Sequence, residues 1–508
     1  MTFAVEMLNI TKKYPGVIAN NNVSLMVKQG EIHGLIGENG AGKSTIMKIL
    51  YGMDEPDEGF VKLFGEEIKI KSPQMAINLG IGMVHQHFML MPNLTVLQNI
   101  ILGRPPKKNF LIDNTAAKER INHIINKYEL NVNLDAKISQ ISVGQKQRVE
   151  IIKALYRDAK ILILDEPTAV LTPNETDKLM DILRKLKEQG CTIIFITHKL
   201  REVMAITDRV TVMRKGMVTG SSDTCDTNTK ELSKLMVGRE VDLTVKMNEY
   251  HPMDQVLKVD KISALDKSGA LALRQVSFDV KAGEIVGIAG VEGNGQTELI
   301  EVIAGMIKLE NGEIILNGKK IKKYSIRRRR EMGMSHIPED RLKVGVSKEC
   351  TIKDNIILGR YYQKPYCKNG IIDNRKLYQF SEKLCKDFLV KTPDSSYKLN
   401  TLSGGNMQKV IFAREVETNP NLLIAAQPTR GVDIGAIEYI HNRIAQLRDE
   451  GKAVLLVSAE LDEILALSDR IFVMYEGEIT AEFKRGDPGL SQIGMYMMGA
   501  KRQNRSEV

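Results

Sequence analysis

The chain alternates short apolar runs with longer segments of helical period, and this alternation predicts its fold class. An apolar run at residues 32–36 precedes a helical segment at 45–50, and two more apolar runs, at 161–164 and 192–196, are separated by another helical pattern. Short apolar runs bounded by turn residues are typical of strands in a parallel sheet with both faces covered. We therefore predict an α/β core.

Other segments of the first half have different patterns. Residues 5–28 and 59–70 show strand-and-turn patterns that indicate antiparallel pairing, whereas residues 95–137 are mostly of helical pattern. Further strands are expected around a turn at Gly216. The first half is therefore expected to add antiparallel strands and a block of helices to the core.

The pattern of the first half recurs in the second half. Several segments have similar counterparts in the same order, namely 27–32 with 280–285, 95–104 with 351–360, and 141–145 with 402–406. A kept order with small changes in spacing indicates a tandem duplication. We predict two domains, residues 1–240 and 255–508, joined by a polar linker at 241–254.

Composition identifies a globular protein. Hydrophobic residues make up 43% and charged residues 27% of the chain, no run approaches the ~18 apolar residues of a membrane span, and the N-terminus lacks a signal-peptide pattern. The five cysteines form no C-x-x-C pair, which favours the reduced thiols of a cytosolic protein. The net charge of +9 permits an anionic partner but identifies none. The arginines at 327–330 are expected to form one exposed helix rather than a binding patch.

The strongest chemical signal is the loop after the apolar run at 32–36. It reads G-x-x-x-x-G-K-S, and its members are Gly37, Glu38, Asn39, Gly40, Ala41, Gly42, Lys43 and Ser44. Glycines let backbone N–H groups surround a triphosphate, and the helix that continues from Thr45 adds a partial positive charge at its N-terminus. Lys43 is expected to reach the β- and γ-phosphates, and Ser44 to hold Mg²⁺.

Two carboxylates end the apolar run at 161–164. The carboxyl edge of a parallel sheet lies beside the phosphate loop, so Asp165 is expected to organise Mg²⁺ and Glu166 to polarise the attacking water. His198 follows the next predicted strand and is expected to touch the γ-phosphate. Gln86 is expected to link the metal or the attacking water to the helical region.

Two further features are less specific by themselves. Residues 142–145, Ser-Val-Gly-Gln, precede an amphipathic helix and are expected to present backbone donors to an anion. Tyr14 lies upstream of the first strands and is expected to stack on adenine, while an ordinary edge-strand tyrosine is an equally weighted alternative.

This ordered set of motifs resembles the ATPase subunits of ABC transporters, and the resemblance covers nearly the whole chain. It implies, in each half, a P-loop nucleotide-binding α/β core with a parallel sheet, an antiparallel β subdomain and a helical subdomain. It also implies that ATP lies between the phosphate loop of one half and the Ser-Gly-Gly segment of the other. For the intact first loop, that segment is Ser403, Gly404 and Gly405.

The second half departs from the pattern in four features. Gln296 stands at the lysine position, Ala426 and Gln427 replace the carboxylate pair, Ala459 replaces the histidine, and no aromatic residue stands in the place of Tyr14. An opposite charge about 4 Å away, at an effective dielectric near 20, is worth about 4 kcal/mol, so the loss of the lysine alone is severe. The second half is therefore expected to lack catalysis.

The better partner segments nevertheless lie in this second half. Gly404 and Gly405 permit close approach to a γ-phosphate, whereas the first half has Val143 at the middle position. Asp433 follows the second half's Pro-Thr-Arg-Gly run, where the first half has Thr172. This sorting predicts one competent composite ATP site and one inert site.

A tandem ATPase with an inert second half resembles the importers of monosaccharides and nucleosides. The run at 424–433 looks most like the nucleoside branch, and a ribose- or galactose-type sugar importer is the alternative. The resemblance implies two membrane permeases and an extracytoplasmic solute-binding lipoprotein as partners, and a peripheral position on the cytoplasmic face of the membrane. A soluble ribosome-associated tandem ABC ATPase is less consistent, because that group keeps two intact sites. The intact first half argues against a non-catalytic scaffold, and no nucleic acid is expected.

Overall fold

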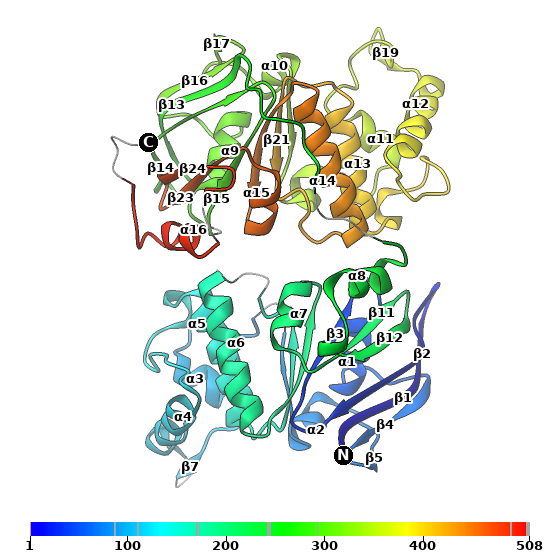
Figure 1. Ribbon diagram of the computed structural model, residues 1–508, viewed down its shortest axis with the longest axis vertical. Coiled ribbons are helices and arrows are strands. Elements are labelled where there is room, and N and C mark those ends of the chain that lie inside the picture. Colours follow the sequence, from blue (N-terminus) through cyan, green and yellow to red (C-terminus); the bar gives the residue numbers. More distant parts are fainter. Residues whose placement is uncertain are drawn as a thin grey trace. The chain divides into compact units, whose positions relative to one another are not determined.

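The computed structural model describes residues 2–85, 88–108, 111–168, 171, 173–240, 245–291, 293–487 and 490–503. The chain divides into two compact units, Met1–Val241 and Asp242–Val508. Figure 1 draws the first unit in blue to green and the second in green to red.

A six-stranded sheet, in the order β12-β11-β3-β10-β9-β6, forms the core of the first unit. Its strands are β3 (Ile32–Gly37), β6 (Ile81–Val84), β9 (Ile161–Asp165), β10 (Thr192–Thr197), β11 (Arg209–Arg214) and β12 (Met217–Asp223). Neighbouring strands are parallel except for β12, which pairs antiparallel with β11. Every residue of β3 and β10 is buried, as expected for strands with both faces covered.

An antiparallel sheet and a group of helices complete the first unit. The sheet, in the order β2-β1-β4-β5, contains β1 (Phe3–Tyr14), β2 (Val17–Lys28), β4 (Glu58–Leu63) and β5 (Glu66–Glu67). The helices are α1 (Lys43–Leu50), α2 (Pro73–Asn78), α3 (Val96–Ile101), α4 (Asn114–Tyr128), α5 (Val143–Tyr156), α6 (Pro173–Glu188), α7 (Leu200–Ile206) and α8 (Thr229–Val237), and β7 (Lys107–Lys108) pairs with β8 (Leu111–Ile112). Figure 1 shows α3, α4 and α5 at one side of this unit and β1, β2 and β4 at the other.

The second unit repeats this arrangement. Its larger sheet has the order β18-β21-β22-β15-β23-β24 and its antiparallel sheet the order β14-β13-β16-β17. The strands are β13 (Gln255–Leu265), β14 (Leu271–Lys281), β15 (Glu284–Ala289), β16 (Asn311–Leu316), β17 (Lys319–Lys320), β18 (Met334–Ile337), β21 (Leu422–Ala426), β22 (Ala453–Ser458), β23 (Arg470–Tyr475) and β24 (Glu478–Lys484), with a hairpin of β19 (Cys367–Lys368) and β20 (Ile371–Ile372). The helices are α9 (Gln296–Ala304), α10 (Ile326–Glu331), α11 (Ile352–Ile357), α12 (Asn374–Asp387), α13 (Gly404–Val416), α14 (Ile434–Asp449), α15 (Leu461–Leu467) and α16 (Leu490–Met497).

Apolar packing fixes the helix that follows the phosphate loop. Ile46, Met47 and Leu50 of α1 are 0% exposed and belong to a cluster that also contains residues of β1 and β2. Burying one such side chain contributes about 1.5–3 kcal/mol. The first turn of α1 is therefore anchored firmly to the core.

The arginines at 327–330 form the expected helix, α10, but the expectation that this helix is exposed is wrong for Arg329. Arg329 is 4% exposed, and its Nη1 donates to the carbonyl oxygens of Val302 at 2.8 Å and Ile303 at 2.7 Å. Carbonyls in the last turn of a helix lack partners within it, so the guanidinium caps the C-terminal end of α9. Burial lowers the pKa of Arg329.

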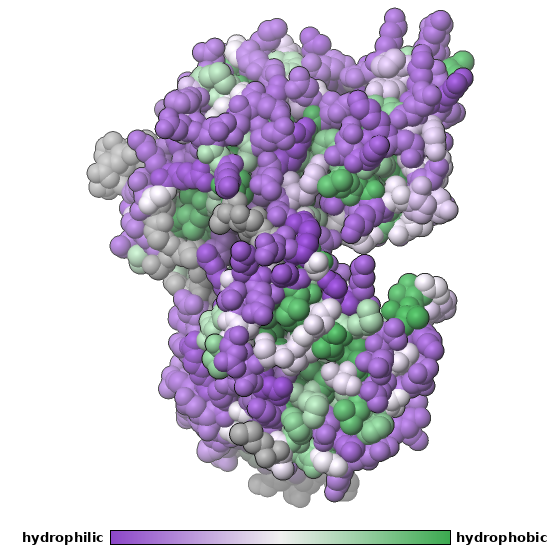
Figure 2. Space-filling model, turned by 45° about the vertical axis from the view of Figure 1, so that its right-hand side comes forward, coloured by the Kyte–Doolittle hydropathy of each residue, from purple (hydrophilic) through white to green (hydrophobic). Residues whose placement is uncertain are grey.

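Hydrophilic residues cover most of the visible surface of each unit (Figure 2). The large apolar side chains that are fully buried, such as Phe195 and Phe412, lie in the cores instead. None of the helices in the described ranges combines the length and apolar character needed to cross a membrane.

Candidate functional site

The predicted phosphate loop joins the end of β3 to the start of α1. Gly42 has a φ of 99°, and a Cβ atom there would lie 2.5 Å from both the carbonyl oxygen of Ala19 and Nδ2 of Asn20. Glycine is therefore required on two grounds, conformation and space. Nδ2 of Asn20 donates to the Gly42 carbonyl at 3.2 Å, a support from β2 that no sequence motif indicated.

Lys43 is the first residue of α1 and is only 6% exposed. Its Nζ donates to the carbonyl oxygens of Gly37 at 2.6 Å and Glu38 at 3.0 Å. Burial lowers the pKa of Lys43, and the negative charges of Glu166, Asp165 and Glu38 oppose this effect. The ammonium thus lies folded over the loop and within the field of the two carboxylates that end β9.

Glu166 and His198 form a hydrogen-bonded pair at the edge of the sheet. Nδ1 of His198 lies 2.9 Å from Oε1 of Glu166, and the backbone N–H of Glu166 donates to the carbonyl of Ile196 at 2.9 Å. Burial acts to raise the pKa of Glu166, but the hydrogen bond and charge of His198, together with Lys43, lower it below its usual value. Glu166 has a φ of 47°, an uncommon conformation that is concentrated at functional sites.

Asp165 and Ser44 carry oxygen atoms of the kind that bind a divalent cation. Burial, and then the charge of Glu166, raise the pKa of Asp165, so this carboxylate lies where a positive charge would stabilise it. Ser44, the second residue of α1, is exposed, and carboxylate and hydroxyl oxygens are ligands that Mg²⁺ prefers. Gln86, the third expected ligand, lies outside the described residues, as does Thr172.

A residue that sequence reasoning missed holds the turns around this pair. Glu202 accepts from the hydroxyl of Thr168, two residues after Glu166, at 2.7 Å and from that of Thr197, the residue before His198, at 3.3 Å. In the second unit Glu463 accepts from the Thr429 hydroxyl at 2.8 Å. The internal repeat, which aligns these glutamates, could have identified the contact.

Tyr14 ends β1 and is 40% exposed. Its hydroxyl donates to Asp54 at 2.5 Å, and Nζ of Lys12 lies 5.6 Å from the centre of its ring. These contacts fix the ring at the end of the strand, and adenine stacking stays a prediction.

The second unit keeps the shape of this site with different side chains. Gln296 is 8% exposed and donates from Nε2 to the carbonyl of Val291 at 3.2 Å, the loop carbonyl that corresponds to that of Glu38. Gln427 has the same φ as Glu166, 47°, and its Oε1 accepts from the backbone N–H of Ala459 at 3.1 Å. The lysine, the carboxylates and the histidine are thus replaced without a change in local backbone.

Glu339, beside the second loop, is bound by a hydroxyl and by an arginine. The Thr297 hydroxyl donates to Oε2 of Glu339 at 2.8 Å, and Nη1 of Arg430 lies 3.0 Å from Oε1. Glu339 follows β18, as Gln86 follows β6 in the first unit. An ion pair therefore lies beside the hydroxyl that corresponds to Ser44.

Ser142 and Ser403 begin the two helices that were expected to face an anion. Each caps its helix: the Ser142 hydroxyl accepts from the backbone N–H of Gln145 at 3.3 Å, and the Ser403 hydroxyl from that of Asn406 at 3.4 Å. Serine at this position satisfies one N–H of the first turn and leaves others directed outward.

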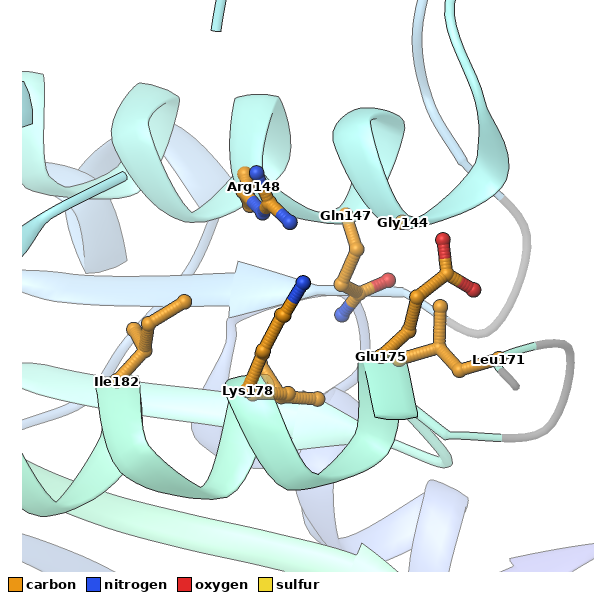
Figure 3. Close-up of a pocket in the computed structure, with 8 residues that line it drawn as sticks. Gly144, Gln147, Arg148, Leu171, Glu175, Lys178 and Ile182 are labelled. Atoms are coloured by element: carbon orange, nitrogen blue, oxygen red, sulfur yellow. The ribbon is translucent and has the colours of Figure 1, made fainter. Parts of the chain in front are cut away.

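The glycine two residues after each of these serines faces a carboxylate of the next helix. Figure 3 shows Glu175 of α6 turned toward Gly144 in a small pocket between α5 and α6, where a larger side chain would collide with it. At Gly405 a Cβ atom would lie 2.6 Å from Oδ2 of Asp433, the residue that caps α14. The two segments differ at their middle residue, which is Val143 in one and Gly404 in the other.

The chain is similar to proteins of known class. A family model described as ABC transporter matches residues 20–169 and 273–430. The guanosine import ATP-binding protein NupO of Bacillus subtilis is 50% identical over 508 residues, which is 100% of both chains. The nucleoside import ATP-binding protein NupA of Lactococcus lactis subsp. cremoris is 48% identical over 97% of this chain and 98% of its own. The glucose import ATP-binding protein TsgD13 of Haloferax volcanii is 45% identical over 97% of this chain and 96% of its own.

A solved structure agrees on the fold. The archaeal ribosome recycling factor aABCE1, in its complex with the ribosomal stalk protein aP1, matches with a TM-score of 0.65 over 96% of this chain and 92% of its own, at 19% identity. At that identity the likeness shows the fold alone. The predicted α/β fold and the predicted ATPase class are confirmed by the family match and by these full-length relatives. The chain belongs to the ABC transporter family, as an ATP-hydrolysing subunit with two ABC transporter domains in tandem.

Proposed function

We propose that this chain powers the import of nucleosides. The observation that carries the proposal is the intact set of Lys43, Asp165, Glu166 and His198 in a chain that is 50% identical, end to end, to a guanosine import ATP-binding protein. A second relative at 48% identity is described as a nucleoside import protein. Sugar import is the second candidate, favoured by the 45% identity to a glucose import protein, while a ribose import protein of Lactococcus lactis is 38% identical.

Binding of ATP would use the loop of the first unit. In this proposal residues 37–45 surround the phosphates, Lys43 turns from the carbonyls of Gly37 and Glu38 to the β- and γ-phosphates, and Tyr14 stacks on adenine. Ser44, Asp165 and Gln86 would hold Mg²⁺, which supplies charge neutralisation at the phosphates. A bound phosphate is negatively charged, and it is therefore a stronger hydrogen-bond acceptor for Lys43 than a backbone carbonyl.

Hydrolysis would depend on the Glu166–His198 pair. Because its pKa is lowered, Glu166 is ionised at neutral pH and can accept a proton from the attacking water. An ionised carboxylate only accepts hydrogen bonds, so Nδ1 of His198 donates, and this bond fixes the direction of the carboxylate. In this proposal His198, oriented by the same bond, would meet the γ-phosphate.

We further propose that Ser403, Gly404 and Gly405 of the second unit bind the same ATP. Support comes from α13, a 13-residue helix whose first backbone N–H groups favour an anion. Val143 in the corresponding segment of the first unit places a branched side chain at this approach. The second loop, with Gln296 and without carboxylates after β21, would then be the inert site.

The remaining parts of the proposal concern the assembly. The chain would bind two membrane permeases near the Gln86 region and the helical subdomain, and would act with an extracytoplasmic solute-binding lipoprotein. It would lie on the cytoplasmic face of the membrane, without nucleic acid.

Uptake in cells that lack the chain tests the solute. We expect the wild-type chain to restore uptake of labelled guanosine and other nucleosides, and the Glu166→Gln variant to restore none. Restored uptake of labelled ribose or glucose, but not of nucleosides, would establish the sugar candidate instead. Recovery of the chain with ribosomes rather than with membranes would refute both.

A further inference from the structure

An arginine of the second unit lies against the Ser403–Gly405 segment. Arg341 begins one turn of π-helix, Arg341–Gly345, just after β18. Its Nη1 donates to the carbonyl oxygen of Arg430 at 3.0 Å and its Nη2 to that of Gly431 at 3.2 Å. A Cβ atom added to Gly404 would lie 2.8 Å from Nη2 of Arg341.

The two carbonyl bonds fix this guanidinium beside the first turn of α13. Burial lowers the pKa of Arg341, with the charge of Asp340 opposing the shift, but a guanidinium stays charged at neutral pH. A guanidinium carries five N–H donors in a planar fork that matches the oxygens of a phosphate, and these two bonds leave part of the fork for a ligand. The N-terminus of α13 and the arginine thus both favour an anion at this point.

The first unit lacks both members of this contact. Arg341 is the fourth residue after the end of β18, and the fourth residue after the end of β6 is Phe88. Val143 stands in the first unit where Gly404 stands in the second. The arginine and the glycine that clears space for it therefore occur together, in the unit whose Ser-Gly-Gly segment is assigned to the competent site.

We propose that Arg341 binds the γ-phosphate of the ATP held at Ser403–Gly405 and makes this site distinguish ATP from ADP. The proposal rests on the proposed function, in which this segment meets the γ-phosphate. ADP has no group at that position, so loss of the arginine weakens ATP and leaves ADP nearly unchanged. The ordinary alternative, that Arg341 only ties the loop to the Arg430–Gly431 turn, predicts equal effects on both nucleotides.

The test compares Arg341→Gln, Arg341→Lys and Lys343→Gln in the full chain. Lys343 belongs to the same segment, and its side chain is 86% exposed, so it is a matched charge control. We expect Arg341→Gln to raise the KM for ATP and the Kd of a non-hydrolysable ATP analogue by about tenfold or more, since hydrogen bonds to charged groups contribute this much. The Kd for ADP should change less than about twofold, Arg341→Lys should recover part of the loss, and Lys343→Gln should resemble the wild type.

Equal changes for ATP and ADP, or no change for either, would overturn the proposal. If Arg341→Gln does not fold, Arg341→Lys, which keeps the positive charge but loses the planar fork of donors, provides the same comparison of ATP with ADP. Ser403→Ala tests the composite site separately from the role of Arg341. If it lowers ATPase activity while Arg341→Gln does not, Arg341 is excluded and the composite site stands. If neither variant affects activity, the proposed role of Ser403–Gly405 in the composite site is refuted as well.

Discussion

Replacing Glu166 by Gln separates the chemical role of this residue from its structural role. Gln keeps an Oε1 that accepts from Nδ1 of His198, which lies 2.9 Å away in the wild type, but it cannot take a proton. The second unit shows that the backbone accepts this residue, because Gln427 occupies the corresponding position with the same φ of 47°. We therefore expect a folded protein that binds ATP and does not hydrolyse it.

The expected loss of ATPase activity follows from the role of Glu166 as general base. A positioned general base contributes typically about 10²–10⁴-fold to a rate, so phosphate release should fall by at least about a hundredfold. Because the pKa of Glu166 is already lowered from 4.5, its protonation should not reduce wild-type activity between about pH 6 and 8; activity is lost through this group only as the pH falls below that pKa.

Steady-state phosphate release, paired with binding of labelled ATP, measures both quantities. Gln427→Glu is the matched control, since it restores a carboxylate on the unit that lacks Lys43's counterpart and should not raise activity. If Glu166→Gln keeps more than about a tenth of the wild-type rate, Glu166 is not the base. If it loses ATP binding to the same extent as hydrolysis, the carboxylate serves the loop rather than the water.

Three further tests have defined outcomes. Lys43→Ala should weaken ATP binding roughly a thousandfold, because a charge–charge attraction of about 4 kcal/mol is removed, and equilibrium binding of a fluorescent ATP analogue checks this. Ser403→Ala should lower ATPase activity about tenfold or more while Ser142→Ala changes it less than about twofold, and equal losses would refute the asymmetric pair of sites. Arg329→Ala should destabilise the second unit by about 2–3 kcal/mol in urea unfolding, because the carbonyl of Ile303 loses its partner and that of Val302 keeps only the Gly305 N–H. Arg327→Ala, with a side chain 60% exposed, should cost less than about 0.5 kcal/mol.

Local spacing and strand order explain what the sequence could predict. The phosphate loop was predictable because its spacing and flanks lie in one short segment. Glu166 and His198 are far apart in the chain, but β9 and β10 are adjacent and parallel, with Asp165 paired to Ile196, so the ends of these strands must meet. A strand that ends in a carboxylate, followed by another that ends near a histidine, therefore sufficed to bring both residues to one edge of the sheet, but their hydrogen bond was not predicted.

Contacts that depend on packing between elements were not predictable in this way. The run of four arginines indicates a charged helix, but nothing in it marks Arg329 as the one that faces the end of α9. Arg341 likewise has no motif of its own, and its relation to Gly404 depends on the turn at Arg430 and Gly431. In both cases a guanidinium is held by backbone carbonyls, which a sequence pattern does not reveal.

The replacements in the second unit remove the charged groups of the first unit's site but keep the local backbone contacts. Gln296 repeats one of the carbonyl contacts of Lys43, and Gln427 replaces the Glu166–His198 bond by a bond to the backbone of Ala459. Amide side chains of similar size keep the loop and the strand ends in place. If the Ser403 segment serves the ATP of the first unit, selection would act on this geometry and not on hydrolysis in the second. In that case variants that disturb the fold of the second loop, such as a large side chain at Gly295, which has a φ of 101°, should reduce ATPase activity even though the proposal places no hydrolysis there.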